Sequence, residues 1–581
     1  MIKYKILIND RNYSNFSFVD DDTHEDIIDT PENGLSNINP IANKMFTKDV
    51  FIYDNNIVTI TFSHIRTGIP IAGILMLENN KTFGRSKNKK RLLYKCIPDD
   101  KHLPAFLVPY EIQLSFSKIQ KNKYVLFKFE NWDDKHPHGS IIETLGNVGS
   151  LDVFYEYQLH CKSLHISLTN FTNKTREQLQ KKSQEEYIEQ IFHNPNFHIE
   201  DRRHIQTIFS IDPIGSTDFD DAFSIECIED TNHTKQYKVS IYIANVYFWL
   251  ETLGLWKSFS SRVSTIYLPD RRRPMLPTVL SDNLCSLQEG HSRFAFCMDI
   301  ILDELNNIQS IEYMNVIIKV NKNFRYEEPE LIYKTPDYSL LLSITTKLDK
   351  SVKDSHDVVA YWMVKMNIEC GNYMANKNIG IFRSVNYIHS IEKEFQDEIC
   401  HLEENTQRII KSWSNTTGKY IVYNSSCSLE HELMKTKNYV HITSPIRRLI
   451  DLLNQMWISK SICIIENGSK DSEHFFIDWI NKLDYINASM RSIRKIQTDC
   501  NILHECFNNT IIMNTVYYGI IFDKIKKNDG SIIYMVYLED LKLLGRIKTY
   551  EEFDNYTKHS FKIFLFEDEY KVKKKIRFQL I

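Results

Sequence analysis

Short β-rich runs near both ends of the chain, separated by long helical patterns, constrain the fold more than any other feature. Between residues 50 and 160, such runs are separated by turn and charge signals, for example Asn79-Asn80 and Asp133-Asp134. This spacing is typical of small β-barrels of about five strands, and the stretch is long enough for two of them. The runs cover 50–53, 57–62, 71–77 and 124–129.

The middle and the end of the chain follow different patterns. Residues 174–193 are charged and lack Gly and Pro, which predicts a surface helix between two regions. Residues 200–505 mix strands with longer helices, so we expect one large α+β domain there. Its strands are expected at 237–244 and 294–302, and its helices at 357–375, 446–465 and 478–507. The final strands, at 516–522, 532–537, 561–566 and 576–580, predict a third small barrel.

Acidic residues are concentrated at the start of the chain. The 581 residues include 71 Lys and Arg and 75 Asp and Glu, for a formal net charge of −4. Residues 1–43 hold eight acids and three bases, so the rest of the chain has 67 acids and 68 bases. This balance excludes a strongly basic nucleic-acid coat protein but allows basic grooves on a neutral body. We expect residues 10–43 to be poorly ordered or to form a flap.

The cysteines indicate reduced thiols. The chain has 11 Cys, an odd number, and no Cys-x-x-Cys pair, so we expect neither a zinc site nor a disulfide framework. The start of the chain has no apolar core long enough for a signal peptide. No run of about 18 uncharged apolar residues predicts a membrane helix. We therefore expect an intracellular, reducing compartment such as the cytoplasm, and no membrane partner.

Four carboxylates within ten residues give the strongest chemical signal. Asp212 ends a β-like run, a turn with Pro213 and Gly215 follows, and the next carboxylates are Asp218, Asp220 and Asp221. If the turn folds these groups together, their mutual repulsion raises their pKa values, and bound Mg²⁺ or Mn²⁺ relieves it. A solvated acidic loop is the alternative, whereas the spacing does not fit a calcium loop of the EF-hand type.

A second signal lies in residues 439–453. Ser444 and Pro445 predict the N-cap and the first position of a helix. Arg447 and Arg448 then fall in the first helical turn, where the helix dipole disfavours cations. An anion bound by the free N–H groups and a guanidinium would explain this placement. In the alternative reading, one arginine pairs with a carboxylate and the other is solvated.

A third motif, in residues 264–287, completes a family resemblance. It reads STIYLPDRRRPMLPTVLSDNLCSL and stands between the motifs IDP…DFDDA and TSPIRR. Three long motifs in this order, over about 240 residues, resemble the RNase II/RNase R (RNB) superfamily. The catalytic RNB domain of that superfamily also forms the hydrolytic subunit of the eukaryotic RNA exosome. Residues 132–146 resemble the second cold-shock barrel of the exosome-type branch. The compact chain and its bias towards Asn, Ile and Lys, which suggests an AT-rich genome, indicate a family member from a large DNA virus.

The resemblance implies a domain order. An α+β RNB domain is expected to be flanked by two N-terminal cold-shock-like OB barrels and one C-terminal OB barrel. The expected divisions are an acidic segment at 1–45, barrels at 46–95 and 96–170, a helical connector at 171–198, the RNB domain at 199–508 and the last barrel at 509–581.

The resemblance also implies an activity: hydrolysis of single-stranded RNA from its 3′ end to nucleoside 5′-monophosphates. Asp212, Asp218, Asp220 and Asp221 match the catalytic aspartates of the family, which hold two Mg²⁺ ions. Arg447 matches the catalytic arginine, with Arg448 as the alternative. Tyr267 matches a tyrosine that contacts the 3′-terminal nucleotides, although a tyrosine of the core is the alternative.

Two basic runs lie in the expected barrels and predict RNA binding. Basic grooves with aromatic residues bind single strands by charge and stacking, whereas solvated charged hairpins are the alternative. The candidate residues are Arg85, Lys87, Lys89, Lys90 and Arg91 in the first run and Lys573, Lys574 and Lys575 in the second.

The chain also departs from the family pattern. Tyr242 and Asn245 stand where the family often has His and Asp, Ala360 and Tyr361 replace a Glu pair, and Gln497 lies where a Glu is frequent. The aspartates are intact, so we expect activity, with the rate and the product length open. The main alternative is a catalytically impaired RNB-fold protein for RNA binding or assembly, and an endonuclease is a further one.

Overall fold

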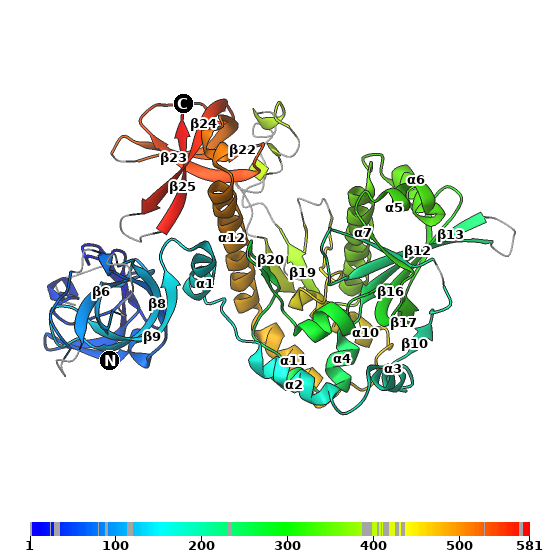
Figure 1. Ribbon diagram of the computed structural model, residues 1–581, viewed down its shortest axis with the longest axis horizontal. Coiled ribbons are helices and arrows are strands. Elements are labelled where there is room, and N and C mark those ends of the chain that lie inside the picture. Colours follow the sequence, from blue (N-terminus) through cyan, green and yellow to red (C-terminus); the bar gives the residue numbers. More distant parts are fainter. Residues whose placement is uncertain are drawn as a thin grey trace.

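The computed structural model describes most of the chain (Figure 1). The described residues are 3–23, 25–27, 35–78, 81–86, 91–112, 120–205, 207–229, 235–385, 398–403, 406–407, 409–410, 418–424, 429–431, 436–527, 529–568 and 573–581. Figure 1 shows three parts: N-terminal β-units at the left, a C-terminal sheet above them and a large mixed domain at the right.

A seven-stranded sheet forms the centre of the large domain. Its strand order is β10-β17-β16-β13-β12-β11-β18. The strands are β10 (Ile199–Asp201), β11 (Phe209–Asp212), β12 (Asp221–Glu229), β13 (Lys235–Ala244), β16 (Ser292–Leu302), β17 (Ile308–Lys319) and β18 (Lys322–Arg325). Side chains alternate between two cores, because successive residues of a strand point to opposite faces. Val239, Ile241 and Ile243 of β13 enter one core, and Tyr242 and Ala244 enter the other.

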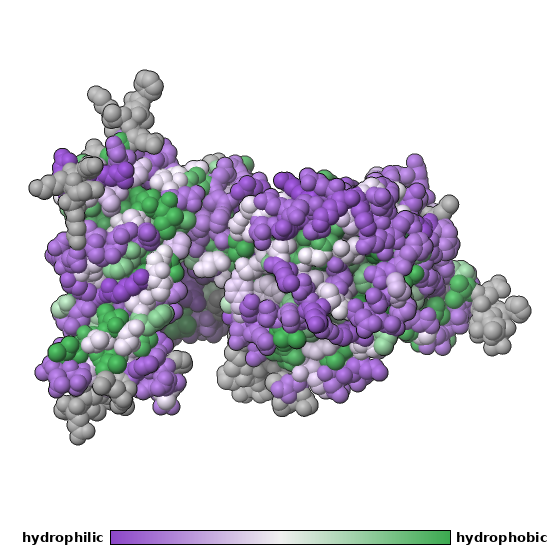
Figure 2. Space-filling model, turned by 90° about the horizontal axis from the view of Figure 1, so that it is seen from below, coloured by the Kyte–Doolittle hydropathy of each residue, from purple (hydrophilic) through white to green (hydrophobic). Residues whose placement is uncertain are grey.

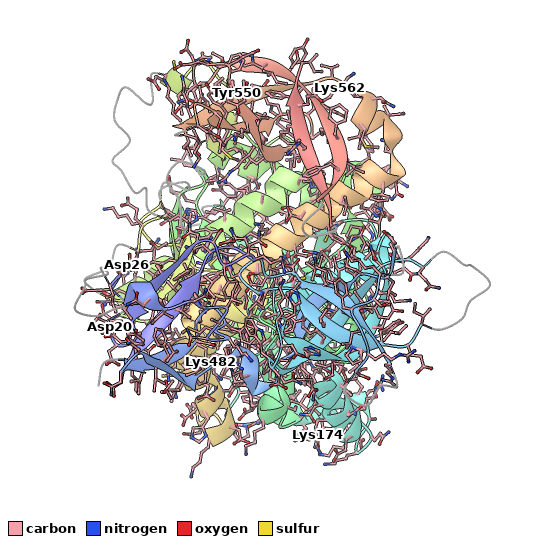
Figure 3. All side chains as sticks on the ribbon, turned by 90° about the vertical axis from the view of Figure 1, so that its left-hand side faces the viewer. Asp20, Asp26, Lys174, Lys482, Tyr550 and Lys562 are labelled. Atoms are coloured by element: carbon pink, nitrogen blue, oxygen red, sulfur yellow. The ribbon has the colours of Figure 1, made fainter. Side chains whose placement is uncertain are left out.

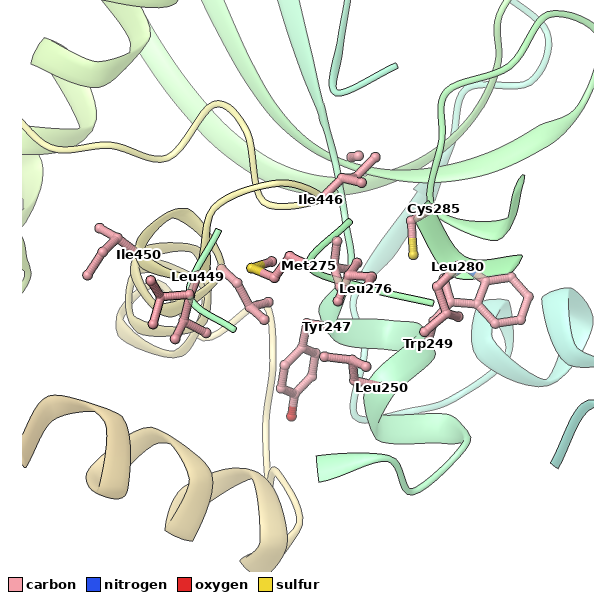
Figure 4. Close-up of a cluster of buried hydrophobic side chains, with 14 of the residues drawn as sticks. Tyr247, Trp249, Leu250, Met275, Leu276, Leu280, Cys285, Ile446, Leu449 and Ile450 are labelled. Carbon is pink, nitrogen blue, oxygen red and sulfur yellow. The ribbon is translucent and has the colours of Figure 1, made fainter. Parts of the chain in front are cut away.

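Helices cover both faces of this sheet and supply the rest of the two cores. One core takes residues of α6 and α7, including Leu341 and Trp362, and the other takes residues of α4 and α10. Figure 4 shows part of the second core, where Tyr247 lies near Met275, and Trp249 lies near Leu280. The helices are α4 (Tyr247–Thr252), α5 (Pro329–Lys334), α6 (Pro336–Leu348), α7 (Ser355–Asn376), α10 (Leu449–Ser461) and α11 (Lys470–Asn481). Two small two-stranded sheets are formed by β14 (Ile266–Tyr267) with β15 (Arg272–Arg273), and by β19 (Ile381–Ser384) with β20 (Lys419–Val422).

The N-terminal units divide differently from the expectation. The strands β1 (Tyr4–Ile8), β2 (Phe16–Asp20), β3 (Val50–Asp54) and β4 (Ile57–Phe62) form a four-stranded sheet in the order β2-β1-β3-β4. The interpretation of residues 10–43 as poorly ordered or a flap was therefore wrong for β2. Ile6, Ile8 and Phe18 are buried in the core of this unit, which outweighs the local acidity.

One closed barrel follows, built from β5-β6-β7-β9-β8. The strands are β5 (Ile71–Leu75), β6 (Leu92–Pro98), β7 (Phe106–Tyr110), β8 (Lys123–Asn131) and β9 (His138–Asn147). The expected boundary at residues 95 and 96 cuts through β6, so the expected division into 46–95 and 96–170 was wrong. Turn signals alone did not reveal that β5 pairs with β8, from Ile71 with Phe127 to Leu75 with Lys123.

Helices connect the barrel to the large domain. They are α1 (Leu151–Cys161), α2 (Thr169–Leu179) and α3 (Gln184–Phe192). The single helix predicted at 174–193 is thus two helices, because Ser183 caps α3 with its side chain and forms a capping box with Glu186.

The C-terminal unit is a five-stranded sheet in the order β23-β22-β21-β24-β25. The long helix α12 (Leu483–Asn508) leads to it, followed by α13 (Thr510–Asn514). The strands are β21 (Tyr517–Lys526), β22 (Ile532–Leu538), β23 (Leu543–Thr549), β24 (Lys558–Asp568) and β25 (Lys573–Leu580). The two edge strands, β23 and β25, lie near each other, so the sheet curls towards a barrel.

The surface is mostly polar over the large domain, whereas apolar residues gather in patches over the N-terminal units (Figure 2). Figure 3 shows Asp20 and Asp26 on one flank of the molecule and Tyr550 and Lys562 on the C-terminal sheet. Among the helices that the structure describes, none combines the length and the apolarity needed to span a bilayer. Every cysteine assigned in the described part is a free thiol.

Candidate active site

The four aspartates gather at one end of the central sheet because of a strand reversal. Strand β11 ends at Asp212, and its antiparallel neighbour β12 begins at Asp221, with Phe209 opposite Phe223. The connection between them turns at Gly215, whose φ of +84° favours glycine. Asp218 and Asp220 lie in this connection.

Contacts from distant segments fix the connection. Phe219 is buried, and its N–H donates to Ser286 Oγ at 2.9 Å, while Ser286 Oγ donates to the Thr217 carbonyl at 2.9 Å. The Ala244 N–H donates to the Asp220 carbonyl at 2.8 Å. Since the backbone on both sides of Phe219 is held in this way, the directions of Asp218 and Asp220 are set by the fold and not by the loop alone.

These aspartates line one pocket of about 890 Å³. The pocket also contains the other predicted residues of the large domain, namely Tyr267, Arg447 and Arg448. Helix α7 supplies a largely apolar wall with Val359, Ala360, Met363 and Val364. The volume of the pocket lies within the range that is typical of small-molecule and cofactor sites.

Burial and mutual repulsion perturb the carboxylates. Burial raises the pKa of Asp212 to about 6, with a further rise from the charge of Asp218. Burial raises the pKa of Asp220 to about 7, and the nearby Arg447 offsets only part of that rise. Burial and the charges of Asp212 and Asp220 raise the pKa of Asp221 well above its usual value. The cluster therefore carries more negative charge than its neighbours neutralise.

Arg447 lies against Asp220, but the helix begins later than predicted. Arg447 Nε donates to Asp220 Oδ2 at 2.9 Å, and the Ile446 N–H donates to Asp220 Oδ1 at 3.1 Å. Helix α10 begins at Leu449, and Arg448 is its extended N-cap residue. The prediction of Ser444 as N-cap and Pro445 as first helical residue was therefore wrong.

Long-range contacts explain that shift. The Thr265 N–H donates to the Arg447 carbonyl at 2.9 Å, and the Leu449 N–H donates to the Val263 carbonyl at 3.0 Å, which keeps Arg448 in an extended bridge. The turn 444–447 nevertheless presents an N–H group and a guanidinium to one carboxylate. The pairing of Arg447 with Asp220 matches the alternative reading, in which one arginine binds a carboxylate, but Arg448 pairs with Asp451 and is not merely solvated; a bound anion stays a prediction.

Arg448 and Tyr267 reach the same pocket from different directions. Arg448 Nη2 donates to the buried Asp451 at 2.8 Å. Tyr267 is 39% exposed, and its hydroxyl donates to Asp218 Oδ2 at 3.5 Å. Tyr267 is thus a pocket residue, and the alternative of a core tyrosine does not hold.

Sequence reasoning missed Arg272 and Asp282. Arg272 Nη1 donates to Asp218 Oδ1 at 2.6 Å, and its Nη2 pairs with Asp282 Oδ2. Arg272 belongs to the run Arg271-Arg272-Arg273, but only the hairpin of β14 and β15 shows which of the three points into the pocket. Arg273 turns the other way, to Asp270 and Glu156.

The departures from the family pattern have structural partners. The Tyr242 hydroxyl shares a hydrogen bond of 2.9 Å with Ser224, and Asn245 Nδ2 donates to Asn315 Oδ1 at 3.1 Å. Gln497 Oε1 accepts the Tyr267 N–H at 3.3 Å. Ala360 lines the pocket, where a carboxylate would add negative charge.

The donor chemistry of the pocket fits a hard divalent cation, because four carboxylates share one cavity and burial raises the pKa values of Asp212, Asp220 and Asp221. Within the described residues, no group of three or more His, Cys, Asp or Glu side chains stands ready to hold a metal ion. Arg272 and Arg447 instead bind Asp218 and Asp220. The carboxylate oxygens of the pocket are thus suitable ligands for a divalent metal ion, but the guanidinium groups of Arg272 and Arg447 contact two of these carboxylates.

None of the described residues of the predicted basic runs lines this pocket. Arg85 and Arg91 belong to the connection between β5 and β6, where Arg91 Nε is 3.8 Å from Glu111. Lys87, Lys89 and Lys90 lie outside the described residues. Lys573, Lys574 and Lys575 are on strand β25, and their side chains lie outside the described part.

Two models of known protein families match this chain. The family model for the RNB domain matches residues 200–341 and 332–462, which contain the central sheet and the pocket. A second model, for the Dis3-like cold-shock domain 2 (CSD2), matches residues 93–157, which overlap the closed barrel. The class defined by this fold and site is that of RNB-domain proteins with a cold-shock barrel. The chain belongs to the RNB superfamily and is related to the exosome subunit Dis3.

Individual relatives agree. The chain is 29% identical over 257 residues to the probable exosome complex exonuclease RRP44 of Caenorhabditis elegans, covering 42% of this chain and 25% of that protein. It is 28% identical over 254 residues to ribonuclease R of Aquifex aeolicus, covering 41% of this chain and 34% of that protein. The chain thus spans between a quarter and a third of the length of these two relatives.

Two solved structures share the fold. Mycoplasma genitalium RNase R in complex with ribose-methylated single-stranded RNA has a TM-score of 0.70 at 14% identity, with 100% of both chains covered. Yeast Ssd1, a pseudonuclease, has a TM-score of 0.57 at 13% identity, with 97% of this chain and 80% of that chain covered. The fold therefore accommodates both a nuclease and a pseudonuclease.

Proposed function

We propose that this protein is a metal-dependent, hydrolytic 3′-to-5′ exoribonuclease that degrades single-stranded RNA to nucleoside 5′-monophosphates. The observation that carries the proposal is the gathering of Asp212, Asp218, Asp220 and Asp221 in one pocket beside Arg447. A surplus of carboxylates next to a guanidinium suits phosphodiester chemistry, in which cations and a positive side chain offset the charge that develops on the phosphate.

The four aspartates would hold two Mg²⁺ ions, with Mn²⁺ as a substitute. When bound, such ions supply an activated water and stabilise the leaving 3′ oxygen. Arg447 would neutralise charge on the non-bridging phosphate oxygens, and the turn 444–447 keeps its guanidinium next to Asp220. Arg272 would hold Asp218 in place until the cations compete for it.

The proposed substrate also needs a binding surface. Tyr267 is exposed at the edge of the pocket and would contact the terminal nucleotides, and Arg448 would contribute positive charge. The basic runs of the β-units would bind the RNA backbone further upstream, so RNA affinity would fall steeply with salt. We place the activity in a reducing intracellular compartment, in keeping with the free thiols.

The second candidate is a catalytically impaired RNA-binding or assembly protein. It is supported by the structural likeness to the pseudonuclease Ssd1 and by the guanidinium groups that contact Asp218 and Asp220. Against it, a protein without metal would keep four mutually repelling carboxylates in one pocket, which is costly.

One experiment separates these functions. Single-stranded RNA labelled at its 5′ end is incubated with the protein and Mg²⁺, and the products are resolved over time. The proposal predicts stepwise shortening from the 3′ end that EDTA stops. Discrete internal fragments would instead indicate an endonuclease, and an unchanged band with folded, RNA-binding protein would indicate the impaired alternative.

A further inference from the structure

The C-terminal sheet has one outer surface that the rest of the protein covers. Ile399 and Ile410, from the segment between β19 and β20, are buried against Ile520 and Phe522 of β21. Met535 and Tyr537 of β22 and, at the margin, Leu544 of β23 belong to the same apolar cluster. Thr406 Oγ1 also donates to Glu539 Oε1 at 2.7 Å. The large domain therefore packs on the outer face of the first strands of this unit.

OB-type barrels bind oligonucleotides through the outer face of their second and third strands. In this unit those strands are β22 and β23. The covered surface spans the first and second strands and reaches Leu544 of the third, so it includes part of that face. Buried apolar contacts occupy part of that face, so a nucleic acid chain bound by the C-terminal unit requires another surface.

The outer face of β24 and β25 has the chemistry for such a surface. Side chains alternate on β24, so Ile563 points into the core and Phe564 points outward, where it is 41% exposed. Arg577 of β25 is the cross-strand partner of Phe564, and its guanidinium lies 4.7 Å from the ring centre of Phe566. Aromatic rings with neighbouring cations bind single strands through base stacking and phosphate contacts.

The same pattern continues on the neighbouring strand. Tyr518 of β21 is 57% exposed, and Lys558 Nζ lies 5.6 Å from its ring centre while it also donates to Glu539 Oε2 at 3.1 Å. Lys562 also alternates to the outer face of β24, as Figure 3 shows at the edge of this unit. Rings and cations therefore alternate over three adjacent strands, and a row of this kind is complementary to an anionic chain of bases.

We infer that the outer face of β24 and β25, with Phe564, Phe566 and Arg577 at its centre, binds single-stranded RNA in place of the covered face of β22 and β23. The inference rests on the proposed function and adds to it the surface that engages the substrate outside the active site.

The test compares two double variants with matched chemistry. The face variant is Phe564→Ala with Arg577→Ala, and the control is Tyr550→Ala with Lys548→Ala. Each removes one aromatic ring and one positive charge from exposed positions of the same unit, and Tyr550 is 74% exposed. Figure 3 shows Tyr550 apart from Lys562. Both are made in the full chain with Asp220→Asn, so that RNA binding is measured without cleavage.

Fluorescence anisotropy with a labelled 20-nucleotide oligo(U) gives the affinity at several salt concentrations. We expect the face variant to bind at least about tenfold more weakly than the parent, with a shallower salt dependence, and the control to stay within about twofold. Near-ultraviolet circular dichroism confirms that both variants are folded.

The possible failures are distinguishable. Equal affinity of the face variant and the control overturns this inference alone. Absence of RNA binding by the parent overturns the proposed substrate together with it. A face variant that keeps its RNA affinity but loses binding to polyglutamate assigns the face to an acidic protein partner, and so also overturns the inference.

Discussion

Two carboxylates in or next to the central sheet are equally buried, but the pKa of one is lowered and the pKa of the other is raised. Asp299 of β16 and Asp220 beside β12 are each 4% exposed. Burial acts to raise the pKa of Asp299, but Arg202 donates to both of its oxygens, at 3.0 and 2.8 Å, and the pKa is lowered. Burial raises the pKa of Asp220 to about 7; the charge of Arg447 lowers this pKa only in part, and the charge of Asp218 raises it further.

The difference shows which charges serve the fold and which are left for a ligand. Asp299 has a bidentate guanidinium and Lys238 at 3.5 Å, so its negative charge is satisfied within the protein. In the pocket, burial raises the pKa values of Asp212, Asp220 and Asp221, and the charge of the nearby Arg447 lowers them only in part. Perturbation of this kind is typical of functional sites.

The largest effect should come from Asp220→Asn. This change removes one proposed metal ligand and the acceptor of Arg447, so we expect the rate of RNA shortening to fall at least about a thousandfold. Initial rates with 5′-labelled RNA measure it. Asp299→Asn is the matched control, since it changes an equally buried carboxylate outside the pocket. Similar activity losses per folded molecule for both variants would erase the distinction between them.

Arg202→Met tests the Asp299 ion pair and should affect the stability of the fold. It leaves Asp299 buried without its bidentate partner, so we expect a loss of roughly 3–5 kcal/mol in the free energy of unfolding. Urea denaturation followed by circular dichroism measures the change. Activity per folded molecule should stay close to that of the parent, and a stable but inactive variant would contradict the structural role of this pair.

The pH dependence of the metal-free protein should report Asp220. Its folded pKa of about 7 lies above the unfolded value, so the stability associated with it is present at low pH and is lost as pH rises towards 7. In EDTA, we expect the parent to lose stability from pH 5 to pH 8 by about 1–3 kcal/mol more than Asp220→Asn does. Thermal melts at each pH test this. Parallel profiles would show that Asp220 is not the responsible group.

Tyr267→Phe should have the smallest effect. The change removes a hydroxyl 3.5 Å from Asp218 and keeps the exposed ring. We expect the rate to fall by about twofold to tenfold, in line with one net hydrogen bond, and Tyr267→Ala to cost more because the ring is also lost. Steady-state kinetics on short RNA measure both variants. A larger effect of the phenylalanine than of the alanine would contradict a contact role for the ring.

The local sequence was sufficient to predict the aspartates of the pocket but not the residues that contact them. Asp212, Asp218, Asp220 and Asp221 stand within ten residues, so a strand and a turn bring them together. Arg272 becomes a pocket residue only because a hairpin places it next to Asp218, and Asp282 follows from the same contact. No spacing rule in the sequence distinguishes Arg272 from the arginines beside it.

Long-range pairing explains the other errors. The helix predicted from Ser444 starts at Leu449, since a bridge to Ser264, far away in the sequence, keeps Arg448 extended. The barrel boundary was misplaced because β6 and β7 pair with each other across residue 95. The β-structure of the N- and C-terminal units and the α+β class of the central domain were predictable from composition and periodicity. Which strands pair with one another depended on contacts across the whole chain.

Metal binding itself tests the central claim most directly. Isothermal titration calorimetry with Mn²⁺ compares the wild-type chain, Asp220→Asn and Asp299→Asn at pH 8. The account predicts two ions per wild-type chain, unchanged binding by a folded Asp299→Asn variant, and loss of an ion or at least about tenfold weaker binding in Asp220→Asn. Equal Mn²⁺ binding by Asp220→Asn and the wild type, or no binding by either, would contradict it.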